Sequence, residues 1–177
     1  MSLPTVATDP GVYAVRADGG LVQIRPARPD DREALIRLNA RSSDRSLYLR
    51  FFAVNRPAAD SYVDFELRPP DDDHAALVAM IGADLVGIAA YERLGPDEAE
   101  VALLIDDSHQ QMGIGTLLLE HLAAIARAAG LRRFVAETLS ENYACSGSSA
   151  ASGSLCIARP NRAPCTSRAV SCPTKRR

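Results

Sequence analysis

The chain has 177 residues, of which 47% are hydrophobic, and its formal net charge at pH 7 is −2. This length is sufficient for one domain with a buried core, and the chain contains no apolar run of the ~18 residues that a membrane-spanning helix requires. Residues 1–144 contain 22 acidic residues and 14 arginines, which makes a poor surface for nucleic acid. The N-terminus has neither a basic start nor an apolar segment typical of a secretion signal, so we expect a cytoplasmic protein.

The first part of the chain predicts a leader, one strand and three helices. Residues 1–20 are expected to form a flexible leader, in which the run VYAV could form a short strand. Asp30 followed by Glu33 resembles a capping box and favours a helix start at that point. In chain order, the strand and the three helices are expected at residues 21–25, 31–42, 46–52 and 57–67.

The pattern changes after residue 73. The apolar runs HAALVAMIG and DLVGIAAYERL are separated by a turn at Gly82, which predicts an antiparallel hairpin. The two strands of the hairpin are expected at residues 74–82 and 84–94, and a third strand at 99–106. From Gly113 apolar residues recur at helical spacing, which predicts a helix with Gly130 as its candidate C-cap. A last strand is expected at 132–139. This order predicts an α/β fold of the α+β kind, with helices on the faces of a mixed sheet.

The most informative stretch is LLIDDSHQQMGIGTLLLEHL, residues 103–122. A buried strand leads through an acidic turn and a glycine-containing loop into a helix. The amides in the first turn of a helix have no internal partners, and the helix dipole places partial positive charge there. Gly113 and Gly115 leave room for a ligand, so the loop predicts a phosphate cradle. It lacks the Lys-Ser/Thr of a P-loop ATPase and the third glycine of a dinucleotide-binding fingerprint.

The combination of a strand, Gln110-x-x-Gly113-x-Gly115, Thr116 and a leucine-rich helix resembles the pyrophosphate motif of the GNAT N-acetyltransferase superfamily, Q/R-x-x-G-x-G/A. RSSDRSLYLRFF and RPPDDDHAALVA are similar to the acetyltransferase domain of bacterial Pat-type protein lysine acetyltransferases. In that group the domain is often fused to an ADP-forming acyl-CoA synthetase or a cyclic-nucleotide-binding module. The likeness covers residues 12–144, and no such module is found in this sequence.

The resemblance implies the GNAT fold and metal-free transfer of acetyl from acetyl-CoA to an amine, with a protein lysine as the expected acceptor. A small-molecule amine is the alternative acceptor. A non-catalytic acyl-CoA-binding regulatory module, or an inactive fragment, is the alternative outside enzymes. The resemblance also implies three sets of residues in cofactor binding. The backbone of Leu103, Leu104 and Ile105 would pair with the pantetheine arm of CoA. The pyrophosphate nest would consist of Gln111, Met112, Gly113, Ile114, Gly115 and Thr116, and Asn142 would contact CoA.

One departure from the family concerns charge at the nest. Relatives commonly have Gly-Arg where this chain has Gln111-Met112, so a cationic contact to the pyrophosphate is expected to be missing. The backbone amides are still expected to bind the phosphates.

Glu100 is the candidate catalytic residue. Acetyl transfer to lysine requires a neutral amine, and holding lysine neutral at pH 7 costs about 4.6 kcal/mol. A carboxylate at the mouth of the site can accept that proton, and Glu100 opens the strand that leads into the phosphate loop, where the family's general base matches. Glu98 would face the same way and is a weaker candidate. The alternative reading of Glu100 is a solvated residue at a strand start.

Residues 145–177 differ in character from the rest of the chain. All four cysteines lie there, without the spacing or histidines of a zinc site. We interpret this segment as a disordered, out-of-frame tail, produced by a one-base deletion in the codon of Ala144, that truncates a GNAT domain spanning 21–144 before its last helix and strands. Where the serines have one of the four codons that begin with T, restoring the base turns four tail residues apolar at helical spacing: Cys145, Ser148, Ser149 and Ser152. Weak stability and weak or absent activity are then expected. The alternative is a genuine disordered tail.

Overall fold

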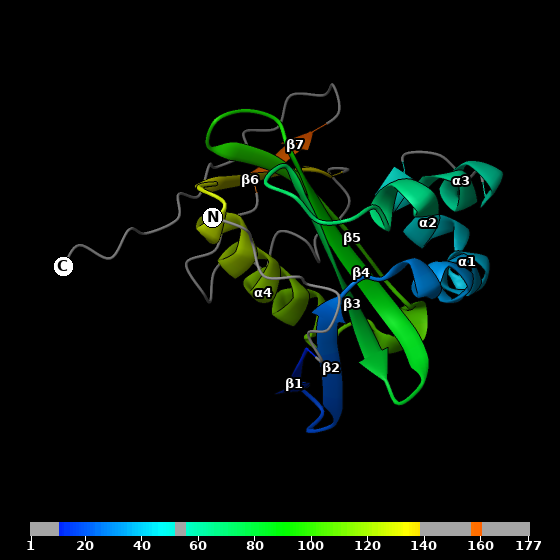
Figure 1. The fold of residues 1–177 in the computed structure, drawn as a ribbon. Coiled ribbons are helices and arrows are strands. Elements are labelled where there is room, and N and C mark those ends of the chain that lie inside the picture. Colours follow the sequence, from blue (N-terminus) through cyan, green and yellow to red (C-terminus); the bar gives the residue numbers. More distant parts are fainter. Residues whose placement is uncertain (1–10, 52–55, 139–156, 161–177) are drawn as a thin grey trace.

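The computed structural model describes residues 11–51, 56–138 and 157–160, which form one mixed sheet with helices on both faces (Figure 1). The four strand pairs from β1–β2 to β4–β5 are antiparallel, whereas the β5–β6 and β6–β7 pairs are parallel. The predicted α/β class with a mixed sheet is therefore confirmed. The strands follow their chain order across the sheet: β1 Val12–Val15, β2 Leu21–Pro26, β3 His74–Ile81, β4 Asp84–Arg93, β5 Glu98–Ile105, β6 Arg133–Thr138 and β7 Ile157–Pro160.

Two apolar layers hold the sheet between the helices. Helices α1 (Arg32–Arg41), α2 (Asp44–Phe51) and α3 (Arg56–Glu66) lie on one face, and α4 (Ile114–Ala128) lies on the other (Figure 1). The first layer includes Leu35, Leu38, Leu47 and Val63, packed with Val78, Ile88 and Leu104 of the sheet. The second includes Ile114, Leu118 and Leu122, packed with Ala79, Ala89 and Val101. Among the described residues, no helix is long and apolar enough to span a membrane.

The run VYAV forms the short strand that the sequence allowed, so the flexible leader expected over residues 1–20 does not extend over residues 11–20. Strand β1 pairs along its length with β2, from Val12 opposite Ile24 to Val15 opposite Leu21. The turn between them is closed by the Arg16 N–H, which donates to the Gly20 carbonyl at 2.8 Å. The hairpin adds a strand to the sheet edge, which satisfies backbone groups that a free leader would leave to solvent. Residues 1–10 lie outside the described part of the chain.

A short strand also lies within the segment that was expected to be disordered. Strand β7 runs parallel to β6, with Ile157 opposite Val135 and Pro160 opposite Thr138. The expectation of disorder is therefore wrong at these four residues, because the outer edge of β6 offers backbone partners to a short extended segment. The other residues of the tail, including those of the reading-frame hypothesis, lie outside the described residues, so the hypothesis stays a prediction.

Candidate active site

The central feature of the site is an opening between β5 and β6. These parallel strands are in register over three residue pairs, which end with Glu100 opposite Val135. Beyond that pair β5 continues to Ile105 and β6 to Thr138, and the described residues show no further pairing between them. An unpaired strand edge presents backbone N–H and C=O groups in a row. One side of β5 is therefore exposed to a ligand along its second half.

The backbone groups that face this opening follow from the pairing of β5 with β4. The Asp106 N–H donates to the Val86 carbonyl at 2.9 Å, and hydrogen-bonded positions alternate along an antiparallel pair. The backbone of Leu104, two residues earlier, therefore faces β4, whereas that of Leu103 faces the opening. Val101 shares the orientation of Leu103, although sequence reasoning did not single it out. The backbone groups of Leu104 are thus directed away from the opening, whereas they were expected from the sequence to pair with the pantetheine arm.

The side chain of Gln110 fixes the end of β5 to the phosphate loop. Its Nε2 donates to the Ile105 carbonyl at 3.3 Å, to Asp107 Oδ1 at 2.9 Å and to the Ser46 hydroxyl at 3.2 Å. The Ile105 carbonyl is therefore already engaged within the protein. Gln110 is the first residue of the sequence motif, and these contacts make it an anchor of the loop.

The acidic turn after β5 ties the loop to helices α1 and α2. Asp107 accepts hydrogen bonds from the Ser43 N–H at 2.6 Å and from the hydroxyl of Ser46. Asp106 accepts from the Ser108 N–H at 2.9 Å and from the guanidinium of Arg41. Burial raises the pKa of the Asp106 carboxyl, but hydrogen bonds from Ser108 and Arg41 outweigh it and hold the pKa at about 2. Both carboxylates therefore serve structure at neutral pH.

The loop that follows has the backbone geometry of an anion nest. Gln111 and Gly113 adopt left-handed conformations, with φ of 63° and 79°, and Gln111 is the single non-glycine residue with positive φ among the described residues. Such a conformation is strained for a residue with a side chain and concentrates at functional sites. Alternation of left- and right-handed residues directs successive N–H groups toward one point. Ile114 and Thr116 follow in the first turn of α4, whose amides add to the same positive end.

Gly115 places this nest against the opening. A Cβ atom at Gly115 would lie 3.3 Å from Leu103 Cδ1, so the first turn of α4 packs closely on β5. Met112 belongs to the loop through its backbone, since its carbonyl accepts a hydrogen bond from the Ala17 N–H at 3.0 Å, while its side chain packs against the core. The first turn of α4 thus lies beside Leu103, whose backbone faces the opening. The order of the loop and the strand edge suits a ligand that joins phosphates to an extended, amide-containing chain.

Glu100 lies where the opening begins. Its neighbours Ala99 and Val101 pack on the α4 side of the sheet, so the half-buried side chain of Glu100 lies on the face covered by α1 to α3. The pKa of the Tyr62 hydroxyl on α3 is raised, mainly because the hydroxyl is partly buried. The positive charge of Arg50 opposes this shift, whereas the negative charges of nearby carboxylates, including Glu100, add to it. Glu100 therefore acts electrostatically on the α3 side of the site.

Two other glutamates lie on the same face, and both are bound to cations. Glu98, the weaker candidate from sequence, forms an ion pair with Arg133. Glu92 stands directly opposite Glu100 in the β4–β5 register and accepts hydrogen bonds from Arg68 at 2.7 Å and from His74 at 2.6 Å. Protonation of Glu98 or Glu92 would weaken these ion pairs.

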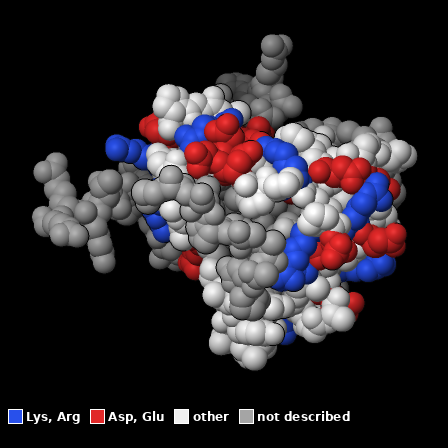
Figure 2. Space-filling model, viewed as in Figure 1, with Lys and Arg blue, Asp and Glu red and all other residues white. Residues whose placement is uncertain are grey.

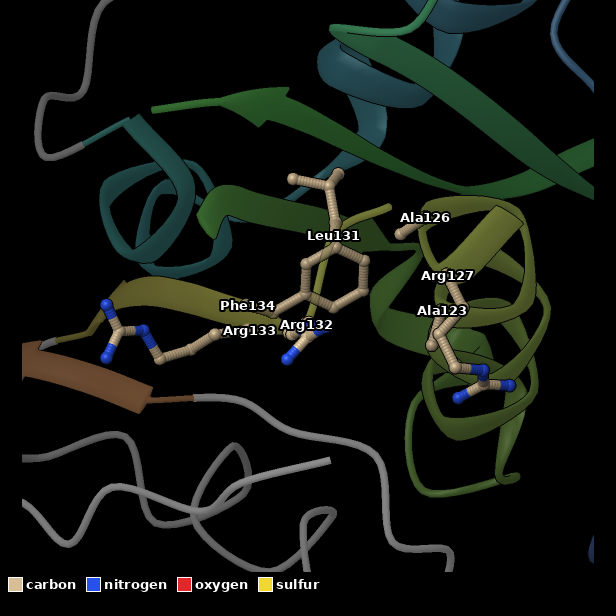
Figure 3. Close-up of a pocket in the computed structure, with 7 residues that line it drawn as sticks. All are labelled: Ala123, Ala126, Arg127, Leu131, Arg132, Arg133 and Phe134. Atoms are coloured by element: carbon tan, nitrogen blue, oxygen red, sulfur yellow. The ribbon is translucent and has the colours of Figure 1, made fainter. Parts of the chain in front are cut away.

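A cavity of about 20 Å³ is the size of one water molecule and lies at the C-terminal end of α4, away from the phosphate loop. Figure 3 shows Ala123 and Ala126 facing Leu131 and Phe134 across it, with the side chains of Arg127, Arg132 and Arg133 around its rim.

Asn142 lies outside the described residues, so its predicted contact stays a prediction. Within the described part of the chain, no group of acidic, histidine or cysteine side chains could hold a metal ion.

Comparison with known proteins identifies the chain's relatives. Residues 43–145 match the acetyltransferase (GNAT) family. Acetyltransferase Pat of Mycolicibacterium smegmatis is 31% identical over 125 residues, which are 68% of this chain and 37% of Pat, so the match spans little more than a third of that relative. Acetyltransferase PA5475 of Pseudomonas aeruginosa is 30% identical over 132 residues, 72% of this chain and 71% of that protein. The crystal structure of the GNAT domain of S. lividans PAT is 37% identical, with a TM-score of 0.73, over 77% of this chain and 83% of that chain. The chain therefore belongs to the GNAT acetyltransferase family.

Proposed function

We propose that this chain transfers an acetyl group from acetyl-CoA to the side-chain amine of a protein lysine, with Glu100 as the general base. The observation that carries the proposal is the arrangement along β5. Glu100 is the last residue paired with β6, the exposed edge follows it, and the phosphate nest lies at the far end. This order matches a ligand with phosphates at one end and a reactive group at the other. The likeness to acetyltransferase Pat supports a protein acceptor.

Acetyl-CoA supplies the acetyl group as a thioester, and the protein positions it. The backbone N–H groups from Gln111 to Thr116 would bind the diphosphate, because they form a nest at the positive end of α4. The exposed backbone of Leu103 and Val101 would pair with the amides of the pantetheine arm, as an added strand does. Gly113 would hold the left-handed conformation that the nest requires, and Gly115 allows the first turn of α4 to pack closely on β5.

Glu100 would accept the proton from the lysine ammonium, directly or through a water molecule. The resulting neutral amine is the nucleophile, and no protein nucleophile is required. The N–H groups on the exposed edge of β5 would stabilise negative charge that develops on the acetyl oxygen. As the new C–N bond forms, the C–S bond of the thioester would break and CoA would leave as a thiolate, which takes up the proton released by the attacking nitrogen. Glu100 would then pass its own proton to solvent, which restores the base.

The α3 side of the site suits the side chain of a lysine. The rings of Phe51 and Tyr62 lie 6.1 Å apart, and those of Tyr62 and Phe65 lie 5.0 Å apart. Tyr62 and Phe65 are partly exposed and can cover the aliphatic stem of a lysine. The exposed run Asp71–Asp73 precedes β3, and Figure 2 shows acidic side chains grouped at this end of the sheet. These carboxylates favour the approach of a cationic acceptor.

The test compares Glu100→Gln with Glu98→Gln, which makes the same chemical change two residues away on the same face. Acetyl transfer is measured with lysine-containing peptides and with small amines, and acetyl-CoA affinity is measured by calorimetry. We expect E100Q to lower kcat by about 10²- to 10⁴-fold with unchanged affinity, and E98Q to retain most of its turnover. Equal turnover in E100Q and the wild type would contradict the role of Glu100. Acetyl-CoA binding without turnover would indicate a regulatory module, and turnover restricted to small amines would contradict the lysine acceptor.

A further inference from the structure

We propose that Arg16, at the turn of the β1–β2 hairpin, is a binding residue for the diphosphate of CoA. This inference rests on the proposed function, because it takes the nest at residues 111–116 as the phosphate site. It assigns a role in ligand binding to a segment that the sequence predicts to be a flexible leader. The cation comes from the opposite end of the domain sequence and reaches the loop through the fold.

The hairpin turn is in direct contact with the phosphate loop. The Ala17 N–H donates a hydrogen bond to the Met112 carbonyl at 3.0 Å. A Cβ atom built at Gly113 would have Ala17 as its nearest neighbour, at 3.8 Å. The turn therefore lies against two consecutive residues of the loop, immediately before the first turn of α4. Arg16 precedes Ala17, so its position relative to the nest is fixed by these backbone contacts.

The guanidinium of Arg16 has unused capacity to donate hydrogen bonds. Its Nη1 lies 3.7 Å from Met112 Sδ, and a thioether is a weak acceptor. Its Nε is buried and has no hydrogen-bond partner in the described part of the chain. The side chain is 14% exposed, and within the described residues it forms an ion pair with Asp18, at 3.0 Å from Nη2. A planar guanidinium with spare donors beside a nest of backbone amides is suited to an anionic oxygen.

Charge at the nest explains why such a residue is needed. The loop from Gln111 to Thr116 contains no cationic side chain, and a diphosphate is an anion that backbone amides alone only partly neutralise. Arg16 would supply the missing positive charge from the side of Met112. Asp18 would then compete with the ligand for the same guanidinium. Asp18 also accepts the Gly20 N–H at 3.1 Å through Oδ1, an interaction that an asparagine can keep.

The test uses two variants with opposite expected effects and one control. Arg16→Gln removes the cation, Asp18→Asn removes its competitor, and Arg37→Gln removes an exposed arginine of α1 whose closest carboxylate contact is 3.9 Å away. Calorimetry measures the affinity of each chain for CoA and for dephospho-CoA, at low and at high salt. Thermal unfolding of each variant checks that the fold is retained.

We expect R16Q to weaken CoA binding about tenfold and to reduce its dependence on salt, while D18N strengthens binding about twofold to threefold and R37Q leaves it unchanged. The loss in R16Q should persist with dephospho-CoA, because the diphosphate is retained in that ligand. Unchanged affinity in R16Q, or a loss seen with CoA alone, would overturn the assignment to the diphosphate. Equal weakening by R16Q and D18N would show that the hairpin matters for structure only. A wild-type chain that does not bind CoA would instead refute the proposed function, and this inference with it.

Discussion

The two glycines of the phosphate loop should respond in opposite ways to the same substitution. Gly113 has a φ of 79°, whereas Gly115 lies within the first turn of α4 in ordinary helical geometry. An alanine at either position adds one methyl group to the same loop. Gly113→Ala and Gly115→Ala are therefore matched controls for each other. The difference between their free energies of unfolding measures mainly the cost of the left-handed backbone conformation at residue 113.

The expected magnitude follows from the surroundings of each glycine. At Gly113 the nearest atoms to a new Cβ are 3.8 Å away, so there is room for the methyl group and the penalty comes from the backbone. The left-handed conformation costs an L-residue about 1–2 kcal/mol. At Gly115 the new Cβ would lie 3.3 Å from Leu103 Cδ1, the end of a flexible side chain that can move by a few tenths of an ångström. There the better helix propensity of alanine contributes up to about 1 kcal/mol.

We therefore expect the free energy of unfolding of G113A to lie about 1–3 kcal/mol below that of G115A, as measured by urea denaturation. CoA affinity should fall in G113A, because relaxation of the left-handed residue turns the amides of the nest away from the phosphates. G115A should keep most of its affinity. Equal stability of the two variants, or a less stable G115A, would refute this reasoning about the loop.

Three further predictions concern the residues that hold the site in place. The pKa of Asp106 is held at about 2 in the folded chain, so its carboxylate contributes about 1–2 kcal/mol to the free energy of unfolding. This contribution is complete above pH ~4 and is lost as the pH falls toward 2. Urea denaturation across this range should show the loss, and Asp106→Asn should abolish this dependence on pH. Leu118→Ala empties a fully buried position under α4 and should cost about 2–5 kcal/mol in urea denaturation, and a cost below about 1 kcal/mol would contradict the packing described. Gln110→Ala should speed amide hydrogen exchange at residues 111–113 relative to residues in β3, because the loop loses its anchor; unchanged exchange would argue against that role.

Much of the fold could be predicted from local patterns in the sequence. The apolar runs HAALVAMIG and DLVGIAAYERL, with a turn at Gly82 between them, indicated the β3–β4 hairpin, and the helical spacing after Gly113 indicated α4. Both signals lie within short stretches of the sequence. The nest was predicted for a similar reason. Its glycines and the following helix are contiguous in the sequence, so no long-range contact was required to recognise it.

The remaining features depend on contacts between distant segments. The opening of β5 follows from where its pairing with β6 stops, at Glu100 and Val135, and a sequence pattern does not specify strand register between segments joined by a helix. The same limit explains why the sequence did not show that the backbone of Leu104 faces β4 while that of Val101 faces the opening. Arg16 lies 96 residues from Met112 along the chain, and only the pairing of β1 with β2 brings the two together.

The most direct test of the proposed site is to follow the backbone amide resonances of the isotope-labelled chain by NMR while CoA is added. The proposed site predicts that the largest shifts occur at residues 111–116 and at Val101 and Leu103, with small shifts at Leu104, whose amide faces β4. The predicted pattern therefore alternates along β5 and is strongest at the loop. Shifts concentrated at Arg127, Arg132 and Arg133 around the small cavity, or no shifts at saturating CoA, would contradict it.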